Sequence, residues 1–267
     1  MDASAIDLVR FALDLVSGAR VQRERTLIRQ MRQDVSPLFE REETLTILDL
    51  GNGWLRPHLS LLQETWHRAV GIDLVNRRQP FWTEYGYRLA RLLFVLRAGL
   101  PLRTLGGLRL VCGDAGKLPF DGASFDLVLS ILAFEHFLDV PSVVAEVKRV
   151  LRPGGLLWAC IHPFTCPSGA HNLTRIGVPC RRIPRGVEPW DHLRKRRLAF
   201  PVPLNGWRIP QYLDAIGQRL EIVRHYCFAR EGERWLTPEI RAELSAYNPD
   251  ELTCMRYVIV ARKGAGA

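Results

Sequence analysis

The stretch TILDLGNGWLRPHLSLLQETWHRAVGID, residues 46–73, decides the fold. An apolar run that ends at Asp49 leads into Gly51-Asn52-Gly53, then a helical pattern, then a second apolar run that ends at Asp73. Strand, glycine turn, helix, strand and acid in this order are typical of a nucleotide-binding βαβ unit. The glycines let the backbone turn sharply beside a ligand, and the helix presents unpaired N–H groups to it. An acid at the end of the second strand can accept both ribose hydroxyls.

Beyond this unit, apolar runs continue to alternate with helical patterns, which predicts one α/β domain with insertions. Further strands are predicted at Leu108–Cys112, Phe125–Ser130, Leu156–Ile161, Glu221–Phe228 and Met255–Ala261. Helices are predicted at Trp82–Gly99, Pro141–Leu151 and Ile209–Gly217, with a short helix begun by Thr237. The helix Trp82–Gly99 is either a crossover helix packed on the sheet or a basic amphipathic surface for a lipid-like partner.

Two segments stand apart from this alternation. Residues 3–18 and Val21–Arg32 predict a pair of helices that form an N-terminal helical cap, residues 1–40, over the ligand cleft or against the sheet. Residues 162–205 lose regular patterning after the fifth strand, so we expect a long insert that serves as a substrate-binding lid. The insert concentrates basic residues: Arg175, Arg181, Arg182, Arg185, Arg194, Lys195, Arg196 and Arg197.

Composition narrows the partners. The 267 residues are 47% hydrophobic and 24% charged, with no targeting helix and no run long enough to span a bilayer, so a cytoplasmic protein is expected. The net charge of +9 favours phosphorylated substrates, nucleic acid or an acidic membrane surface, or else reflects an arginine-rich background. Six cysteines form no C-x-x-C pair, and the spacing of Cys160, His162, Cys166 and His171 matches no familiar zinc pattern, so no metal site is predicted.

Five blocks occur in a characteristic order: LDLGNG from 48, VGID from 70, GDAGKLPF from 113, SFDLVLSILAFEH from 124 and VKRVLRPGGLLW from 147. Together they resemble the class I S-adenosylmethionine-dependent methyltransferases, and within them the methyltransferase type 11 group. The resemblance covers about residues 44–162. It implies a Rossmann-like seven-stranded sheet with helices on both faces, an antiparallel last hairpin, and a methyltransferase domain over residues 41–267.

The resemblance also implies a cofactor, S-adenosyl-L-methionine, with S-adenosyl-L-homocysteine as product. Its methionine part would lie beside Asp49, Gly51, Asn52 and Gly53. Asp73, with Leu74, would bind the ribose hydroxyls, and Asp114 and Ala115 the adenine. Ser130, Ile131 and Leu132 would form the loop under the sulfonium.

One position departs from the family pattern. Two places after Gly53 the family has a third glycine, and here Leu55 follows Trp54. Pro57 indicates that the helix begins one turn differently. The departure also leaves open a non-catalytic, cofactor-binding subunit of a partner enzyme.

Methyl transfer to a hydroxyl needs a base, and ligands of open α/β sheets bind at the carboxyl ends of the strands. Histidines suit a base near neutral pH, and the candidates in order are His162, His136, His171 and His192. SILAFEH stands where many base-modifying enzymes carry N/D-P-P-Y/F. A small-molecule O- or N-methyltransferase is therefore expected, acting on a natural product, sugar or related metabolite, anionic or neutral. The alternative is an RNA methyltransferase that uses the basic insert with Trp190 and Trp207. A membrane partner is less expected, and the sequence does not set the oligomeric state.

Overall fold

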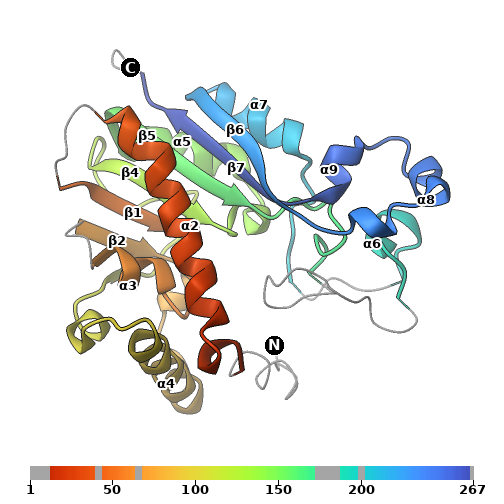
Figure 1. Cartoon of the computed structure of the whole chain (residues 1–267). Coiled ribbons are helices and arrows are strands. Elements are labelled where there is room, and N and C mark those ends of the chain that lie inside the picture. Colours follow the sequence, from red (N-terminus) through yellow and green to blue (C-terminus); the bar gives the residue numbers. More distant parts are fainter. Residues whose placement is uncertain (1–12, 40–43, 64–67, 172–186, 198–201, 265–267) are drawn as a thin grey trace.

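The computed structural model describes residues 13–39, 44–63, 68–171, 187–197 and 202–264. A seven-stranded sheet in the order β3-β2-β1-β4-β5-β7-β6 forms its centre (Figure 1). The strands are β1 (Thr46–Leu50), β2 (Arg68–Ile72), β3 (Arg109–Val111), β4 (Phe125–Ile131), β5 (Leu151–Ile161), β6 (Glu221–Arg230) and β7 (Cys254–Arg262). The first five are parallel, whereas β7 runs antiparallel to both β5 and β6. The fold class and the antiparallel last hairpin expected from the resemblance are confirmed.

The helices and short 3-10 turns connect these strands. The helices are α2 (Ala19–Val35), α3 (Pro57–Gln63), α4 (Phe81–Arg97), α5 (Val140–Val150), α6 (Asp191–Arg194), α7 (Ile209–Gly217), α8 (Pro238–Glu243) and α9 (Pro249–Thr253). The 3-10 turns are η1 (Ser36–Leu38), η2 (Leu74–Asn76), η3 (Leu102–Leu105), η4 (Phe134–His136) and η5 (Glu233–Trp235).

Alternating side chains of the buried strands point to two separate apolar cores. Ile47 and Leu129 face the core that α2, α3 and α4 cover, while Leu48 and Val128 face the core that α5 and α7 cover. Period-two alternation within an apolar run is what places helices on both faces of a parallel sheet. The sheet is therefore the middle of three layers.

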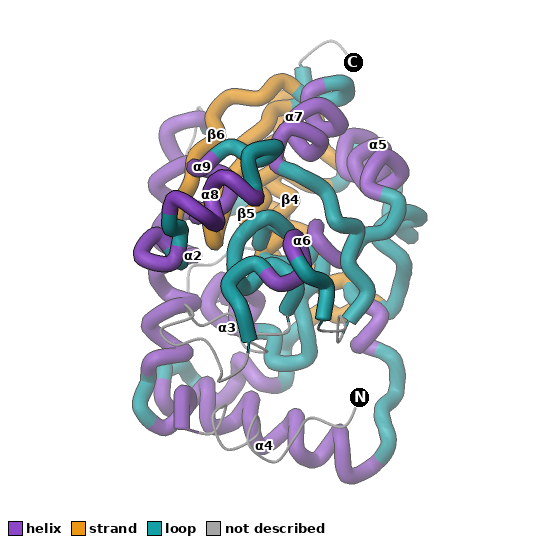
Figure 2. Tube along the Cα trace, turned by 90° about the vertical axis from the view of Figure 1, so that its right-hand side faces the viewer, coloured by secondary structure: helices purple, strands orange, loops and turns teal. Residues whose placement is uncertain are grey.

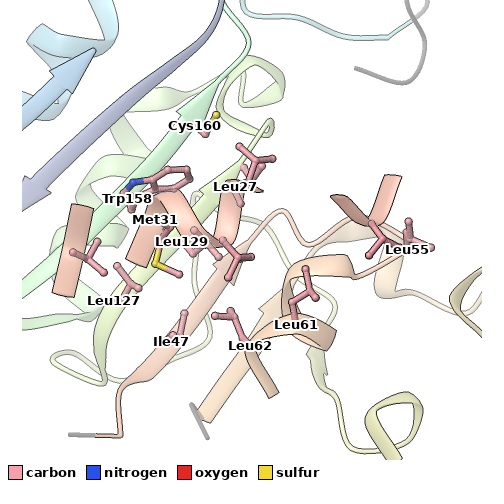
Figure 3. Packing of buried hydrophobic residues seen from close by; sticks show 14 of the residues in the cluster. Leu27, Met31, Ile47, Leu55, Leu61, Leu62, Leu127, Leu129, Trp158 and Cys160 are labelled. Carbon is pink, nitrogen blue, oxygen red and sulfur yellow. The ribbon is translucent and has the colours of Figure 1, made fainter. Parts of the chain in front are cut away.

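The described part of the expected N-terminal cap, α2, packs along one face of the sheet. Leu27, Met31 and Val35 lie four residues apart and are buried in the first core, and Leu27 and Met31 lie close to Trp158 of β5 (Figure 3). The end of α2 is fixed by Asp34, whose Oδ2 accepts hydrogen bonds from Trp158 Nε1 (2.9 Å) and Tyr226 Oη (2.6 Å). Most of the predicted helix 3–18 falls outside the described residues.

The Pro153-Gly154-Gly155 turn lies inside β5, whereas the sequence predicted it between a helix and the strand. Leu151 pairs with Phe125 and Leu156 with Leu127, so the longer β5 segment bulges at the turn. Gly154 has φ 77°, and its N–H donates to Lys263 O across the antiparallel pair with β7. The correction follows from pairing with β4 and β7, which local sequence does not report.

The described residues of the insert, 162–171, 187–197 and 202–205, include regular structure that the sequence did not predict. Among its described residues, Asp191–Arg194 forms α6, and Trp190 is fully buried with Leu244 and Leu252. Trp190 Nε1 also donates to Leu252 O (3.0 Å). These contacts unite α6, α8 and α9 in a small lobe toward which the carboxyl ends of β4 and β5 point (Figures 1 and 2).

We expect Asp34→Ala to lower the free energy of unfolding by about 3 kcal/mol, because it leaves the buried Trp158 donor unpaired and removes the Asp34 contact of the half-buried Tyr226 hydroxyl. Urea titration followed by circular dichroism measures this. Exposed Asp121→Ala is the control and should change stability by less than about 0.5 kcal/mol. Equal losses in both variants would contradict the role assigned to Asp34.

Candidate active site

The carboxyl ends of β1 and β2 bring the glycine loop against Asp73. Gly51 has φ 83°, and a Cβ there would lie 2.5 Å from the Ala133 Cβ, so no other residue fits. Gly53 N–H donates to Asp73 Oδ2 (2.8 Å), and Val75 N–H donates to Asp73 Oδ1 (2.9 Å). Asp73 therefore fixes the loop while its half-buried carboxylate keeps further lone pairs for a ligand.

Other predicted cofactor residues serve the scaffold with their side chains. Asn52 is buried, and its Oδ1 accepts from Asn76 Nδ2 (2.9 Å). Ser130 Oγ donates to Leu50 O (3.0 Å) and so joins β4 to the end of β1. Only the backbone of either residue is left for a cofactor contact.

Leu55 is buried in the first core (Figure 3). Trp54 beside it stacks on Tyr87 of α4 with ring centroids 4.6 Å apart, and Arg91 donates to Trp54 O (3.0 Å). Helix α3 begins at Pro57, as the sequence predicted. The leucine thus occupies core volume and leaves the ligand side of the loop open.

The remaining predicted contacts lie along the same edge of the sheet. Asp114 is exposed after β3, and its Oδ1 accepts from Gly116 N (2.8 Å), while Ala115 is buried. Leu132 follows Ile131 at the end of β4 with φ 54°, and its N–H donates to Cys160 O (2.7 Å). Leu74 is exposed in η2.

Four charged side chains, from Asp49, His58, Glu24 and Arg20, form a network next to the glycine loop. Asp49 is fully buried, with its Oδ2 3.6 Å from His58 Nδ1. His58 Nε2 lies 3.0 Å from Glu24 Oε2, and Glu24 Oε1 pairs with Arg20 at 2.7 Å. Burial alone would lower the pKa of His58, but the Asp49 and Glu24 carboxylates outweigh it and raise that pKa to about 9. Burial opposes ionisation of Glu24, yet Arg20 and His58 bring its pKa down to about 2.

Three of the four histidines predicted as bases, His136, His162 and His171, meet at the ends of β4 and β5. The His171 ring lies 5.0 Å, centroid to centroid, from both His136 and His162. Burial lowers the pKa of His171 to about 4 and that of His162 well below its ordinary value. His192 does not join these ring contacts, since its Nε2 is hydrogen-bonded to Phe164 O (2.7 Å).

Glu135 completes the cluster. Glu135 is 2% exposed, and its carboxylate lies near the backbone N–H groups of Glu135 and His162 without a full hydrogen bond to either. Burial raises the pKa of Glu135 to about 7, against the opposing charge of His136. A buried acid that titrates near neutral pH is suited to general base catalysis.

The protonation of His162 follows from its partners. Ser168 Oγ donates its one proton to Glu231 Oε1, so it can only accept from His162 Nε2, 2.9 Å away. His162 is therefore protonated on Nε2, and Nδ1 is the nitrogen that can accept a proton. Glu231 and Ser168 set this tautomer.

The same side chains include metal-binding types. Glu135, His162 and His171 offer ligand atoms within 4.8 Å of one another, as do His162, Cys166 and Glu231. Cys160 belongs to neither group, so the four residues considered from sequence do not converge. The absence of a resident metal stays a prediction.

Sequence reasoning missed His58, Glu135 and Asn205. Asn205 Nδ2 donates to Phe134 O (2.8 Å) and Phe137 O (3.0 Å), which fixes the turn that carries Glu135. Glu135 adjoins the predicted His136 in sequence, and its position after β4 was the available signal. His58 and Asn205 gave none, because their partners are distant in sequence.

The sequence of the chain is similar to known methyltransferases. Residues 48–159 match a family model described as a methyltransferase domain. The chain is 33% identical over 213 residues to demethylmenaquinone methyltransferase of Deinococcus radiodurans, covering 72% of this chain and 85% of that protein. It is 46% identical over 157 residues to phthiotriol/phenolphthiotriol dimycocerosates methyltransferase 1 of Mycobacterium ulcerans, covering 51% and 56%. Matches to two further mycobacterial proteins of this kind cover 22% and 24% of their length.

A solved structure shows the same fold at low identity. Geranyl diphosphate C-methyltransferase from Streptomyces coelicolor, in complex with Mg²⁺, geranyl diphosphate and S-adenosyl-L-homocysteine, superposes with a TM-score of 0.53 at 14% identity. The superposition covers 90% of this chain and 80% of that one. Across the part of the chain that the structure describes, no helix combines the length and apolar character needed to cross a membrane.

We expect His58→Gln to cost about 3 kcal/mol of stability at pH 6.5 and much less at pH 9.5. The folded pKa of His58, about 9, exceeds its ordinary 6.5, so its contribution is complete below pH 6.5 and is lost as pH rises through 9. Urea unfolding of wild type and variant at both pH values measures the difference.

Exposed His225→Gln is the matched control and should cost little at either pH. A loss of stability for His58→Gln that is the same at pH 6.5 and 9.5 would contradict a protonated His58 between Asp49 and Glu24.

Proposed function

Because the chain belongs to the S-adenosylmethionine-dependent methyltransferases of the type 11 group, we propose that it methylates a hydroxyl group of a small, largely apolar molecule. The observation that carries this proposal is the buried cluster of Glu135, His162 and His171 at the ends of β4 and β5. S-adenosyl-L-methionine supplies an electrophilic methyl group on its sulfonium when bound. The acceptor oxygen must then lose a proton, and the cluster provides the groups for that step.

The loop geometry fits this cofactor. Nothing lies within 4 Å of where a Cβ of Gly53 would be, so a ligand can approach the backbone there. Asp73 sits at the tip of β2 with spare lone pairs for ribose hydroxyls, and Asp114 is exposed after β3 for an amino group. Charged acceptors strengthen such hydrogen bonds.

In this proposal Glu135 accepts the proton of the acceptor hydroxyl. Its oxygens have no full hydrogen bond within the described residues, and its pKa of about 7 leaves much of it ionised at neutral pH. Neutral His162, with Nδ1 unprotonated, would accept a hydrogen bond from the same hydroxyl and so align it for the transfer to Glu135. Its ring is positioned by Ser168 and Glu231. The insert, residues 162–205, would cover the acceptor.

The choice of acceptor rests on the names of the relatives and on the contacts of the described insert residues Trp190 and Arg194. The two curated relatives described above carry names of apolar lipid and quinone substrates, and one of them matches over only half its length. An RNA acceptor is disfavoured because Trp190 is buried and cannot stack on a base. Arg194 is paired with Glu188 and Glu243, so it is neutralised within the protein.

The burial of Leu55 removes the steric reason for a non-catalytic subunit. Calorimetry with S-adenosyl-L-methionine tests the premise, since no binding at millimolar cofactor would refute every enzymatic proposal for this chain.

We expect Glu135→Gln to lower turnover by about a hundredfold or more while cofactor affinity stays within about threefold. The assay measures transfer of tritium from methyl-labelled S-adenosyl-L-methionine to a panel of a long-chain phenol, a long-chain alcohol and a hydroquinone. Wild-type turnover should rise with pH through about 7, as Glu135 loses its proton, and the variant should lack this rise.

Glu251→Gln is the matched control, because Glu251 is also a buried acid but pairs with Arg208 in the small lobe. Its turnover should keep the wild-type pH profile. If Glu135→Gln keeps the profile too, Glu135 is not the base. His162→Ala should also lose about a hundredfold, and wild-type turnover in that variant would exclude His162 from aligning the hydroxyl.

Chelation separates a base from a metal site in the same cluster. We expect turnover to survive dialysis against EDTA, since proton transfer to Glu135, aligned by His162, needs no ion. Loss of turnover that Zn²⁺ or Mn²⁺ restores would instead identify Glu135, His162 and His171 as ligands.

A further inference from the structure

The outer face of α4 is an exposed apolar stripe. Trp82, Tyr85, Leu89, Leu93 and Leu96 recur every three or four residues and so share one face of the helix. Trp82 is 79% exposed, and Phe81 beside it is 74% exposed.

The opposite face of α4 holds the helix to the protein. Phe94 and Val95 are buried in the first core, and Tyr87 stacks on Trp54. The stripe therefore plays no part in holding α4. Exposed aromatic and leucine side chains in a contiguous patch mark an interaction surface.

The segment that carries the stripe is rich in arginine. Residues 74–109 contain seven arginines and a single acid, Glu84. That acid is already paired with Arg88 and Arg91, at 3.2 and 2.9 Å. At the start of α4, a groove of about 470 Å³ is lined by Arg56, Arg77, Arg78, Asn76, Gln79, Phe81, Glu84, Tyr85 and Arg88.

We propose that α4 docks on the surface of a bilayer that contains anionic phospholipids. The stripe would enter the boundary between headgroups and acyl chains, as interfacial amphipathic helices do. The arginines of the groove would bind headgroup phosphates. Helix α4 lies at one end of the molecule in both views, away from α7 and β6 (Figures 1 and 2).

Charge complementarity selects this occupant over a second copy of the chain. Two copies that met through α4 would bring Arg77, Arg78 and Arg97 of each against the same residues of the other, and like charges in contact oppose association. An anionic bilayer instead neutralises them.

Docking would also serve the proposed function, on which this one point rests. Arg56 and Asn76 line the groove and flank the cofactor loop, because Asn76 is hydrogen-bonded to Asn52. The cofactor side of the protein would face the bilayer, from which an apolar acceptor could be drawn.

Co-sedimentation of the full chain with sucrose-loaded vesicles tests docking without any acceptor. Vesicles of phosphatidylcholine with about 30% phosphatidylglycerol should bind at least about tenfold more tightly than pure phosphatidylcholine, and higher salt should weaken this binding. The double variant Trp82→Ser/Leu89→Ser should lose about tenfold or more on anionic vesicles. Arg77→Gln/Arg78→Gln should lose most of the preference for anionic lipid.

Matched controls are Val223→Ser and Arg219→Gln, an exposed apolar and an exposed basic residue near β6 and α7, and both should bind as wild type does. Circular dichroism and cofactor calorimetry verify that each variant is folded. Absence of binding to anionic vesicles by a folded, cofactor-binding wild type would overturn the proposal. So would a dimer in sedimentation velocity that Trp82→Ser/Leu89→Ser abolishes, because a second copy would then cover the stripe. Failure of methyl transfer with vesicle binding intact would count against the proposed function alone.

Discussion

The conformation of the glycine loop, residues 51–53, depends on a carboxylate buried at the end of β1. Asp49 is inaccessible to water, and an ionised carboxylate in that position costs several kcal/mol unless a positive charge lies close to it. His58, on the first turn of α3, supplies that charge, and Glu24 and Arg20 of α2 extend the network of charged side chains. This network of charged side chains thus joins β1, α3 and α2 next to the glycine loop. The conformation of a local motif is in this way supported by a helix thirty residues upstream.

The centre of the sheet could be predicted from sequence because its central strands are buried on both faces. Runs such as Phe125–Ile131 are almost continuously apolar, and the glycines and acids at their ends mark where they stop. The position of α2 was harder to see. Its buried residues Leu27, Met31 and Val35 recur every four positions, but the intervening arginines made the segment read as polar on most faces. The bulge at Gly154 depends on pairing with two other strands, and no local pattern encodes that.

At the candidate site, sequence identified the residue types that follow strands but not their environment. His162, His136 and His171 could be named because two of them follow strands and the third lies close behind. Glu135 could not be distinguished from a solvated acid, because its burial is produced by the turn that Asn205 fixes from seventy residues away. Burial is what changes its chemistry. The roles of the cofactor residues themselves remain predictions from the resemblance.

Net charge gave the least specific information, since a total of +9 does not say where the charge acts. In the described half of the insert, Arg194 and Lys195 are neutralised by Glu188 and Glu243. Residues 74–109, which include α4, hold seven arginines and one acid together with exposed aromatic rings.

The turn between Asp73 and Asn76 connects the arginine-rich segment at α4 to the glycine loop. Asp73 accepts from Gly53 and Val75, and Asn76 bonds to Asn52 and to Val111 O (2.9 Å), so the start of α4 has a fixed place relative to the glycine loop. A surface that binds α4 would therefore orient the cofactor edge as well. The Glu135 cluster lies at the ends of β4 and β5, and β4 is the neighbour of β1 on the side opposite β2, so the glycine loop after β1 stands between the cluster and β2. In the proposed arrangement, the glycine loop joins the helix that docks on the bilayer to the strand ends that carry the proton-accepting Glu135.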